Sequence, residues 1–505
     1  MSETKWLAVS SNGAVALGSY EAGVLAQIYA DVAALNQHSG EQVVGIDAIA
    51  GASAGAVTGA LLAQAIATSA SSDWLTGRLL KAWVEDLNAD TLLGKTDNAS
   101  HSLFDPTAFD VIAPEVLMSD DEVRSACAGR EVPTVALWIA LTNVGGIPYT
   151  IPVSNGEVIA SLYADYEPFL IEKGIPHRAP PIESLKSDAP DTGMPLSWKE
   201  VELAVITSGA FPFAFKNRIL ERDLDNYPDA VRPADGSAKV KFNYTDGGVM
   251  NNNPLGRAID AASFQEKLSG HRGPRTFLII EPDPSTAQQA QANLAKVKNT
   301  LDPNGMPPLQ LGASLINAYF NEAMYRDLAT ATKTNQRLQA LNDTLQALAL
   351  PDEEADAIRK AVGMDYKKVI EIDRIPGVAR LHPLAGSFAG HFGGFFDRRY
   401  RVHDFAVGCL EARNWFKRWY PGADGLKPVL ESKLAEGVSP ATVDPGGFGG
   451  IDDKALGHTK DKVADRVESL VEHALKAGGL LGLLERPLLA LGRHVVREEL
   501  NRVMK

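Results

Sequence analysis

A small-residue turn between two apolar segments constrains this chain more than any other feature. Residues 46–50 form a short apolar run that predicts a buried strand, and residues 54–67 have the composition of a helix. The turn between them reads Gly51-Ala52-Ser53-Ala54-Gly55, a G-x-S-x-G pattern whose flanking side chains must be tiny so that strand and helix can approach each other. We interpret Ser53 as a nucleophile at the positive end of that helix. The alternative is a turn that only packs the helix against the strand.

A second loop of small residues precedes this turn. Residues 5–9 predict a strand, residues 10–18 a glycine-bearing loop and residues 19–36 a helix, which together make the first half of a βαβ unit. If the strands at 5–9 and 46–50 are neighbours, the backbone N–H groups of Gly13, Ala14 and Val15 come close to the serine turn. We expect these groups to form an oxyanion hole. A purely structural turn is the alternative, and the spacing does not match a phosphate-binding loop.

An acidic residue ends a later strand. Residues 239–245 predict a strand that stops at Asp246, and Gly247 and Gly248 follow directly, with Asn252 in the same motif. Open α/β sheets place functional groups at the carboxyl ends of their strands, so we interpret Asp246 as an active-site carboxylate. It could instead close an Asx-turn or cap a helix.

The rest of the chain predicts an α/β protein with a mostly parallel central sheet and a mainly helical C-terminal region. The apolar residues 209–215 contain three phenylalanines and fit either a core or an acyl-chain channel. Residues 144–154 and 159–162 either continue the sheet or cover it. We place a domain boundary so that 1–290 form the α/β domain and 291–505 the helical region. Further strands are expected at 133–143, 200–208, 277–281 and 369–372, and further helices at 71–98, 310–350 and 353–362.

Composition narrows the classes of partner. The net charge is −14 and the pI is about 5.3, which argues against nucleic acid as the main partner. Cys127 and Cys409 are too few for a disulfide framework, and no metal-ligand spacing surrounds them, so we expect no metal and no cofactor.

No signal-peptide pattern is visible, which predicts a cytoplasmic protein. The pattern of residues 480–505 predicts a basic amphipathic helix that either packs on the protein or makes peripheral contact with a membrane.

Four motifs together resemble the patatin-like phospholipase family. In chain order they are GSYEAGVL at 18–25, GASAG at 51–55, TSGAFPFAF at 207–215 and YTDGGVMNNNP at 244–254. This is also their order in the family. The resemblance covers about the first 290 residues and implies a three-layer αβα fold. It also implies a Ser53–Asp246 dyad without histidine or metal that hydrolyses lipid acyl esters. Residues 392–404 are similar to C-terminal extensions of some bacterial members. One position departs from the family pattern, because Leu17 stands where the glycine loop usually carries Arg or Lys.

These observations predict a lipid acyl hydrolase of the phospholipase A or lysophospholipase type, a serine esterase acting through an acyl-Ser53 intermediate. Two alternatives stay open. The first is a non-catalytic lipid-binding or scaffold protein on the same fold. The second is a Ser-His-Asp esterase, which needs a histidine after Asp246 in the chain. The candidates for that histidine are His271, His382, His391, His403, His458, His473 and His494.

Overall fold

The computed structural model describes most of the chain. The described residues are 3–94, 102–105, 107–179, 193–212, 214–227, 229–270, 273–284, 291–292, 294–295, 308–362, 370–377, 380, 382–388, 391–423 and 456–467. The amphipathic segment predicted at 480–505 lies outside them, as does the expected linker at 301–307. None of the helices in the described part is both long and apolar enough to span a membrane.

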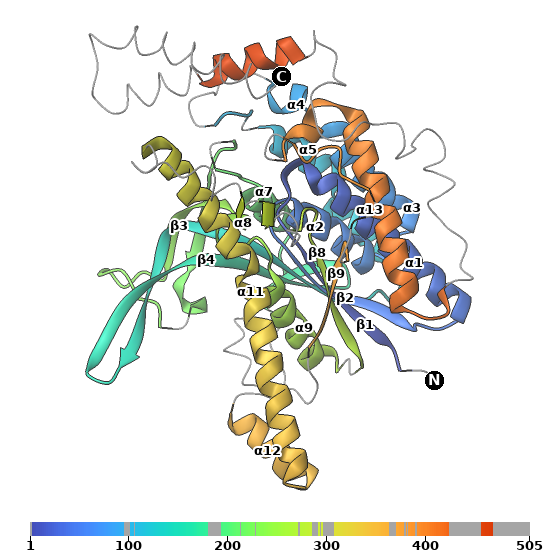
Figure 1. Ribbon diagram of the computed structural model, residues 1–505, viewed down its shortest axis with the longest axis vertical. Helices are drawn as coiled ribbons and strands as arrows, with labels where there is room; N and C mark the ends of the chain where they lie inside the picture. The colour runs from blue at the N-terminus through green and yellow to red at the C-terminus, as the bar shows by residue number, and fades with distance from the viewer. Residues whose placement is uncertain are drawn as a thin grey trace.

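Five strands pair in parallel at the centre of the molecule (Figure 1). β1 and β2 are buried along almost their whole length, as expected for a sheet covered by helices on both faces. Their apolar runs therefore show no alternation with polar residues. In order across the sheet the five strands are β9 (Glu371–Ile375), β8 (Arg275–Ile280), β1 (Lys5–Ser11), β2 (Val44–Gly51) and β3 (Val135–Val153).

Beyond β3 the sheet becomes antiparallel. β3 and β4 (Gly156–Glu172) form a long hairpin that extends away from the body of the molecule (Figure 1). Residues 144–154 and 159–162 therefore continue the sheet. β5 (Ile175–Arg178) pairs with β4, while β7 (Lys239–Asp246) pairs with β3 and with β6 (Arg218–Asp223). These pairings bring the end of β7 next to the carboxyl ends of the parallel strands.

Helices cover both faces of the sheet and enclose two separate apolar cores. One core holds side chains of α1, α2, α3, α5, α7 and α13. The other is smaller and holds side chains of α9 and α11. The arrangement is a three-layer αβα fold, as predicted. The helices of the first 290 residues are α1 (Gly18–Ser39), α2 (Ala54–Ala67), α3 (Ser72–Leu80), the π-helix η2 (Lys81–Asp86), α4 (Ala89–Leu92), α5 (Ala108–Val116), α6 (Asp120–Cys127), α7 (Trp198–Ser208), α8 (Gly248–Asn251) and α9 (Leu255–Ser269), with 3-10 turns η1 (Val15–Leu17) and η4 (Leu224–Asn226).

The strand predicted at 200–208 is wrong, because these residues form helix α7. Val201, Leu203 and Val205 alternate with other residues, which fits a strand, but Leu203 is 42% exposed while Ala204 and Val205 are buried, which is a helical pattern. A capping box starts the helix: Glu200 accepts a hydrogen bond from the Ser197 backbone N–H at 2.9 Å. This S-x-x-E signature was visible in the sequence and outweighs the short alternation.

The described part of the C-terminal region is mainly helical, as predicted, and it contacts the α/β body through several elements. Its strand β9 extends the sheet beside β8, and α13 packs against α1 through two close glycine contacts. A Cβ at Gly23 would overlap the Phe405 carbonyl oxygen, and a Cβ at Gly408 would overlap the Tyr20 carbonyl oxygen. The division at residue 290 stays a prediction. The helices of this region are α11 (Pro308–Ala347), α12 (Asp352–Ala361) and α13 (Arg398–Trp419), with the 3-10 turn η5 (Gly393–Phe396).

Candidate active site

Ser53 occupies a strained turn between β2 and α2. Its backbone has φ 52° and ψ −119°, a conformation that non-glycine residues rarely adopt and that is typical of functional sites. A Cβ at Gly51 would overlap the Gly55 carbonyl oxygen, and a Cβ at Gly55 would overlap the Ser11 carbonyl oxygen. The two glycines of the motif are therefore required because the backbone segments around the turn approach each other closely. The G-x-S-x-G pattern predicted this requirement.

Asp246 lies beside Ser53 at the end of β7. Ser53 Oγ donates a hydrogen bond to Asp246 Oδ2 at 2.5 Å, and the Gly248 backbone N–H donates to Asp246 Oδ1 at 2.7 Å. Asp246 is held there because β7 pairs with β3, with Asp246 opposite Leu141. The structure thus brings together the two residues that the sequence singled out from positions far apart in the chain.

Burial makes the Asp246 carboxylate a stronger base than usual. The side chain is 2% exposed, and this burial raises the pKa of Asp246 to about 7, although the hydrogen bonds from Ser53 and Gly248 act in the opposite direction. A base with a pKa near neutral pH combines partial deprotonation with enough basicity to accept a proton. The pair can therefore act as a nucleophile and its general base.

The loop that precedes α1 touches Ser53 but differs in one respect from the expectation. The Gly13 N–H donates to the Asn252 carbonyl oxygen at 3.1 Å, and Asn252 Nδ2 donates to the Gly13 carbonyl oxygen at 3.3 Å. The Gly13 N–H is therefore occupied. The prediction that it is a free donor for the oxyanion hole is wrong. The N–H groups of Ala14 and Val15 have no hydrogen-bond partner among the described residues. Asn252, part of the predicted motif, thus clamps this loop beside the nucleophile.

Ser208 is a site residue that the sequence reasoning missed. Its Oγ accepts a hydrogen bond from the Ser53 backbone N–H at 2.9 Å and donates to the Ala140 carbonyl oxygen at 2.7 Å. Ser208 is fully buried, and its own carbonyl oxygen accepts from the Gly247 N–H at 3.1 Å. One side chain therefore connects the serine turn with β3 and with the Asp246 segment. The signal is its place in the family motif at 207–215, whereas the strand predicted at 200–208 includes Ser208 only as its last residue.

An apolar cavity opens beside Ser53. It has a volume of about 30 Å³, and Phe211 and Phe215 of the phenylalanine-rich loop line it, while Phe213 lies outside the described residues. Both lining phenylalanines also pack on the larger core, which confirms the interpretation of this loop as core, while its role as an acyl-chain channel stays a prediction. The remaining lining residues are Val15, Ala54, Val57, Trp83, Leu87, Phe109, Gly209 and Phe395.

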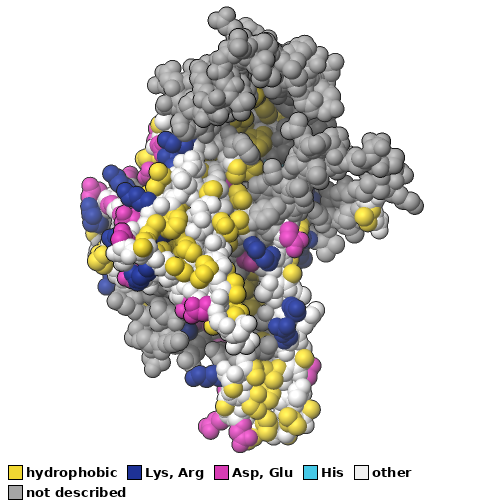
Figure 2. Space-filling model, turned by 90° about the vertical axis from the view of Figure 1, so that its left-hand side faces the viewer, with side chains coloured by type: hydrophobic (Ala, Val, Ile, Leu, Met, Phe, Trp, Pro, Cys, Tyr) yellow, Lys and Arg dark blue, Asp and Glu magenta, His cyan; other side chains and the backbone are white. Residues whose placement is uncertain are grey.

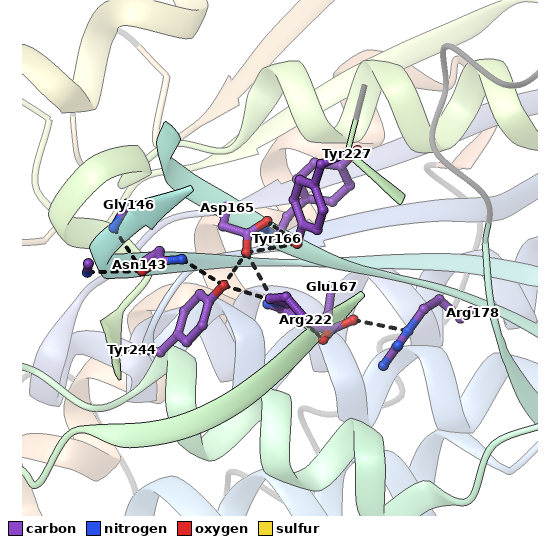
Figure 3. Close-up of polar contacts among 10 residues, drawn as sticks. Asn143, Gly146, Asp165, Tyr166, Glu167, Arg178, Arg222, Tyr227 and Tyr244 are labelled. Atoms are coloured by element: carbon purple, nitrogen blue, oxygen red, sulfur yellow. Dashed lines mark hydrogen bonds and ion pairs between the residues drawn. The ribbon is translucent and has the colours of Figure 1, made fainter. Parts of the chain in front are cut away.

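A separate polar cluster fixes the strand that carries Asp246. Arg222 Nε donates to Asp165 Oδ2 at 3.0 Å and to the Tyr244 hydroxyl at 2.8 Å, and Tyr244 donates to Asp165 at 2.6 Å (Figure 3). Arg222 also pairs with Glu167. This buried network links β6 and β7 to β4. It lines a larger cavity of about 350 Å³ that shares no lining residue with the Ser53 cavity, so it is not the candidate active site.

The described part of the chain offers no alternative catalytic chemistry next to Ser53. None of its histidines hydrogen-bonds to Ser53 or Asp246; His391 pairs with Asp283 at 3.1 Å and His403 with the Pro383 carbonyl oxygen at 3.0 Å. His271, His473 and His494 lie outside the described residues. Within those residues no group of three or more His, Cys, Asp or Glu side chains could hold a metal. Cys409 is buried and Cys127 partly exposed, and both are free.

Comparison with known proteins identifies the class. Residues 9–259 match the family of patatin-like phospholipases, and with this domain the chain belongs to that family. It is similar to an uncharacterized protein, y4iI, of Sinorhizobium fredii (strain NBRC 101917 / NGR234), with 24% identity over 486 residues. This match covers 82% of the chain and 64% of y4iI, so the chain spans less than two thirds of that relative.

A search of solved structures matches the crystal structure of VipD from Legionella pneumophila. The identity is 10% and the TM-score 0.26, over 98% of this chain and 88% of VipD. At that score the likeness carries no argument about this protein.

Proposed function

We propose that this protein hydrolyses fatty-acyl esters of lipids, as a phospholipase A or lysophospholipase, through a Ser53–Asp246 dyad. The observation that carries the proposal is the 2.5 Å hydrogen bond from Ser53 Oγ to Asp246 Oδ2, made by a serine on a strained strand-to-helix turn. Membership of the patatin-like phospholipase family supports a lipid substrate.

In the first half of the proposed reaction, Asp246 accepts the proton of the Ser53 hydroxyl while Oγ attacks the ester carbonyl carbon. The negative charge on the carbonyl oxygen is stabilised by the N–H groups of Ala14 and Val15, with that of Ala54 at the start of α2. When the carbon–oxygen bond to the alcohol breaks, Asp246 returns the proton to the leaving alcohol. The product is an acyl-Ser53 enzyme.

In the second half, Asp246 takes a proton from water as the water oxygen attacks the acyl carbonyl carbon. The bond to Ser53 Oγ then breaks, Ser53 recovers its proton and the fatty acid leaves. No cofactor is needed for either step. The acyl group would enter from the side of the apolar cavity beside Ser53, and the burial that raises the pKa of Asp246 makes it basic enough to act in both steps.

Labelling with a fluorophosphonate probe, together with hydrolysis of a panel of p-nitrophenyl esters and phospholipids, tests this proposal. Wild-type protein should label and hydrolyse esters, while Ser53→Ala should do neither. Protein that neither labels nor hydrolyses any ester would favour a non-catalytic lipid-binding role. A histidine-to-alanine variant as inactive as Ser53→Ala would favour a Ser-His-Asp triad; His391→Ala and His403→Ala are the first to compare.

A further inference from the structure

A short segment from the C-terminal region lies over the candidate active site. We call residues 391–396 the roof segment. The Ala16 N–H follows those of Ala14 and Val15 in the chain, and it donates to the His391 carbonyl oxygen at 3.1 Å. A Cβ at Gly394 would lie 3.0 Å from Ala16 Cβ, so the two backbones are in close contact. The roof segment lies outside the matched family domain, yet it packs directly on the loop beside Ser53.

The roof segment contributes one aromatic side chain, Phe395, to the cavity wall, and Phe392 packs behind it. The Phe392 ring lies 5.8 Å from Phe104, 6.0 Å from Phe211 and 6.0 Å from Phe395, measured between ring centroids. These are distances at which aromatic rings attract one another. Phe395 is 6% exposed and lines the same cavity as Ser53. The C-terminal region thus contributes part of the surface that an acyl group at Ser53 would meet.

Arg401 of α13 holds the roof segment in place. Its Nη1 donates to the carbonyl oxygens of Gly394 at 2.9 Å and Phe395 at 3.1 Å, and its Nε donates to the Val84 carbonyl oxygen at 2.9 Å. Burial lowers the pKa of Arg401 to about 10, so the side chain keeps its charge at neutral pH. Because Val84 belongs to the π-helix that carries the cavity residue Trp83, this arginine fixes two walls of the cavity relative to each other.

The cavity is too small for a long acyl chain while these walls stay in place. Its volume of about 30 Å³ leaves room for about two water molecules, since one water needs about 10–15 Å³ of such space. A second apolar cavity of about 20 Å³ shares Val57, Leu87 and Phe109 with it. A longer acyl chain therefore fits only if a side chain that lines the cavity is replaced by a smaller one. Among the lining residues, Phe395 comes from outside the matched family domain.

We propose that Phe395 closes the acyl side of the catalytic cavity and sets the length of acyl group that the enzyme accepts. This proposal rests on the proposed function. Removing the ring enlarges the cavity and leaves the chemical groups of Ser53, Asp246, Ala14 and Val15 in place, and a larger ring reduces the cavity. The substrate preference should therefore move in opposite directions for small and large replacements.

The test measures kcat/KM for a series of p-nitrophenyl esters from acetate to dodecanoate, on the full chain. Phe395→Ala and Phe395→Leu should raise the ratio of dodecanoate to butyrate activity by about tenfold or more, because one methylene group in an apolar pocket already changes discrimination by about tenfold. Phe395→Trp should lower the same ratio. Phe416→Leu is the matched control, since Phe416 is buried on α13 and does not line the cavity.

The outcomes separate the two proposals. An unchanged chain-length profile in folded Phe395→Leu and Phe395→Trp, or an equal shift in Phe416→Leu, would overturn the role of Phe395 and leave the dyad intact. Wild-type protein without Ser53-dependent hydrolysis would overturn both. Thermal unfolding of each variant identifies any that does not fold, and the leucine and tryptophan variants decide the question if the alanine variant is unstable.

Discussion

Replacing Asp246 by asparagine should abolish ester hydrolysis and also change how stability depends on pH. In the folded protein burial raises the pKa of this carboxyl from 3.8 to about 7, while the unfolded chain keeps the ordinary value. Between these two values the folded state holds a proton that the unfolded state has lost. The contribution of Asp246 to stability therefore falls as pH rises from about 4 to about 7, and asparagine, which does not titrate, removes this contribution.

The magnitude follows from the size of the shift. About three pKa units at 1.36 kcal/mol each correspond to roughly 4 kcal/mol as an upper value. The asparagine side chain also changes the hydrogen bonds to Ser53 and Gly248, but that contribution is the same at every pH. Only the pH dependence of the stability difference between the variant and the wild type comes from the titration of Asp246. Asp404 has a similarly raised pKa and cancels because both proteins contain it.

The assay is denaturant unfolding of wild type and Asp246→Asn across the range from about pH 4 to about pH 8. The variant should gain stability relative to the wild type as pH rises, by a few kcal/mol across the range. Wild-type activity should rise over the same range and level off above about pH 7, since the base must be deprotonated. Two parallel stability curves would refute the raised pKa, and an active Asp246→Asn would refute the dyad.

Three further predictions concern neighbours of this carboxylate. Ser53→Ala should lose fluorophosphonate labelling and hydrolysis while circular dichroism stays unchanged; activity above a few per cent of wild type would contradict the nucleophile. Ser208→Ala leaves the Ser53 N–H without its acceptor, so we expect up to about a hundredfold loss in kcat with little change in KM, and about 1–3 kcal/mol lower stability by denaturant unfolding; an unchanged kcat would show that this hydrogen bond does not position Ser53. Gly13→Ala forces a Cβ into the Asn252 Oδ1 atom and should lower kcat at least about tenfold, whereas wild-type kinetics would show that the loop can move without harm.

The features that depend on local chemistry were predictable from the sequence. The serine turn and the strand ending at Asp246 follow from short-range patterns, because only small residues fit a tight turn and functional groups gather at strand ends. The structure forms both elements and joins Ser53 to Asp246 by a hydrogen bond.

The features that could not be predicted depend on contacts between distant segments. Ser208 acts through a hydrogen bond to a residue 155 positions away, and no local pattern encodes that distance. The Gly13 N–H was expected to be free, but its partner Asn252 comes from a segment 239 residues later. The roof segment was visible only as an aromatic stretch, since its position over Ser53 is set by α13. Short alternating runs such as 200–208 fit both strand and helix until the capping residues are weighed.

The contact of α1 with α13 has a consequence for anyone who wishes to study the family domain alone. α1 is buried on nearly all sides, and Gly23 and Gly408 let the two backbones touch. A chain ending shortly after β8 would uncover this apolar face and would leave β8 as an open edge, since β9 covers it in the whole protein. Apolar side chains already gather in places on the surface of the whole protein (Figure 2), and further exposed apolar surface and unpaired strand edges promote self-association. The shortened protein should therefore aggregate on expression, and an inactive preparation of it would say nothing about Ser53.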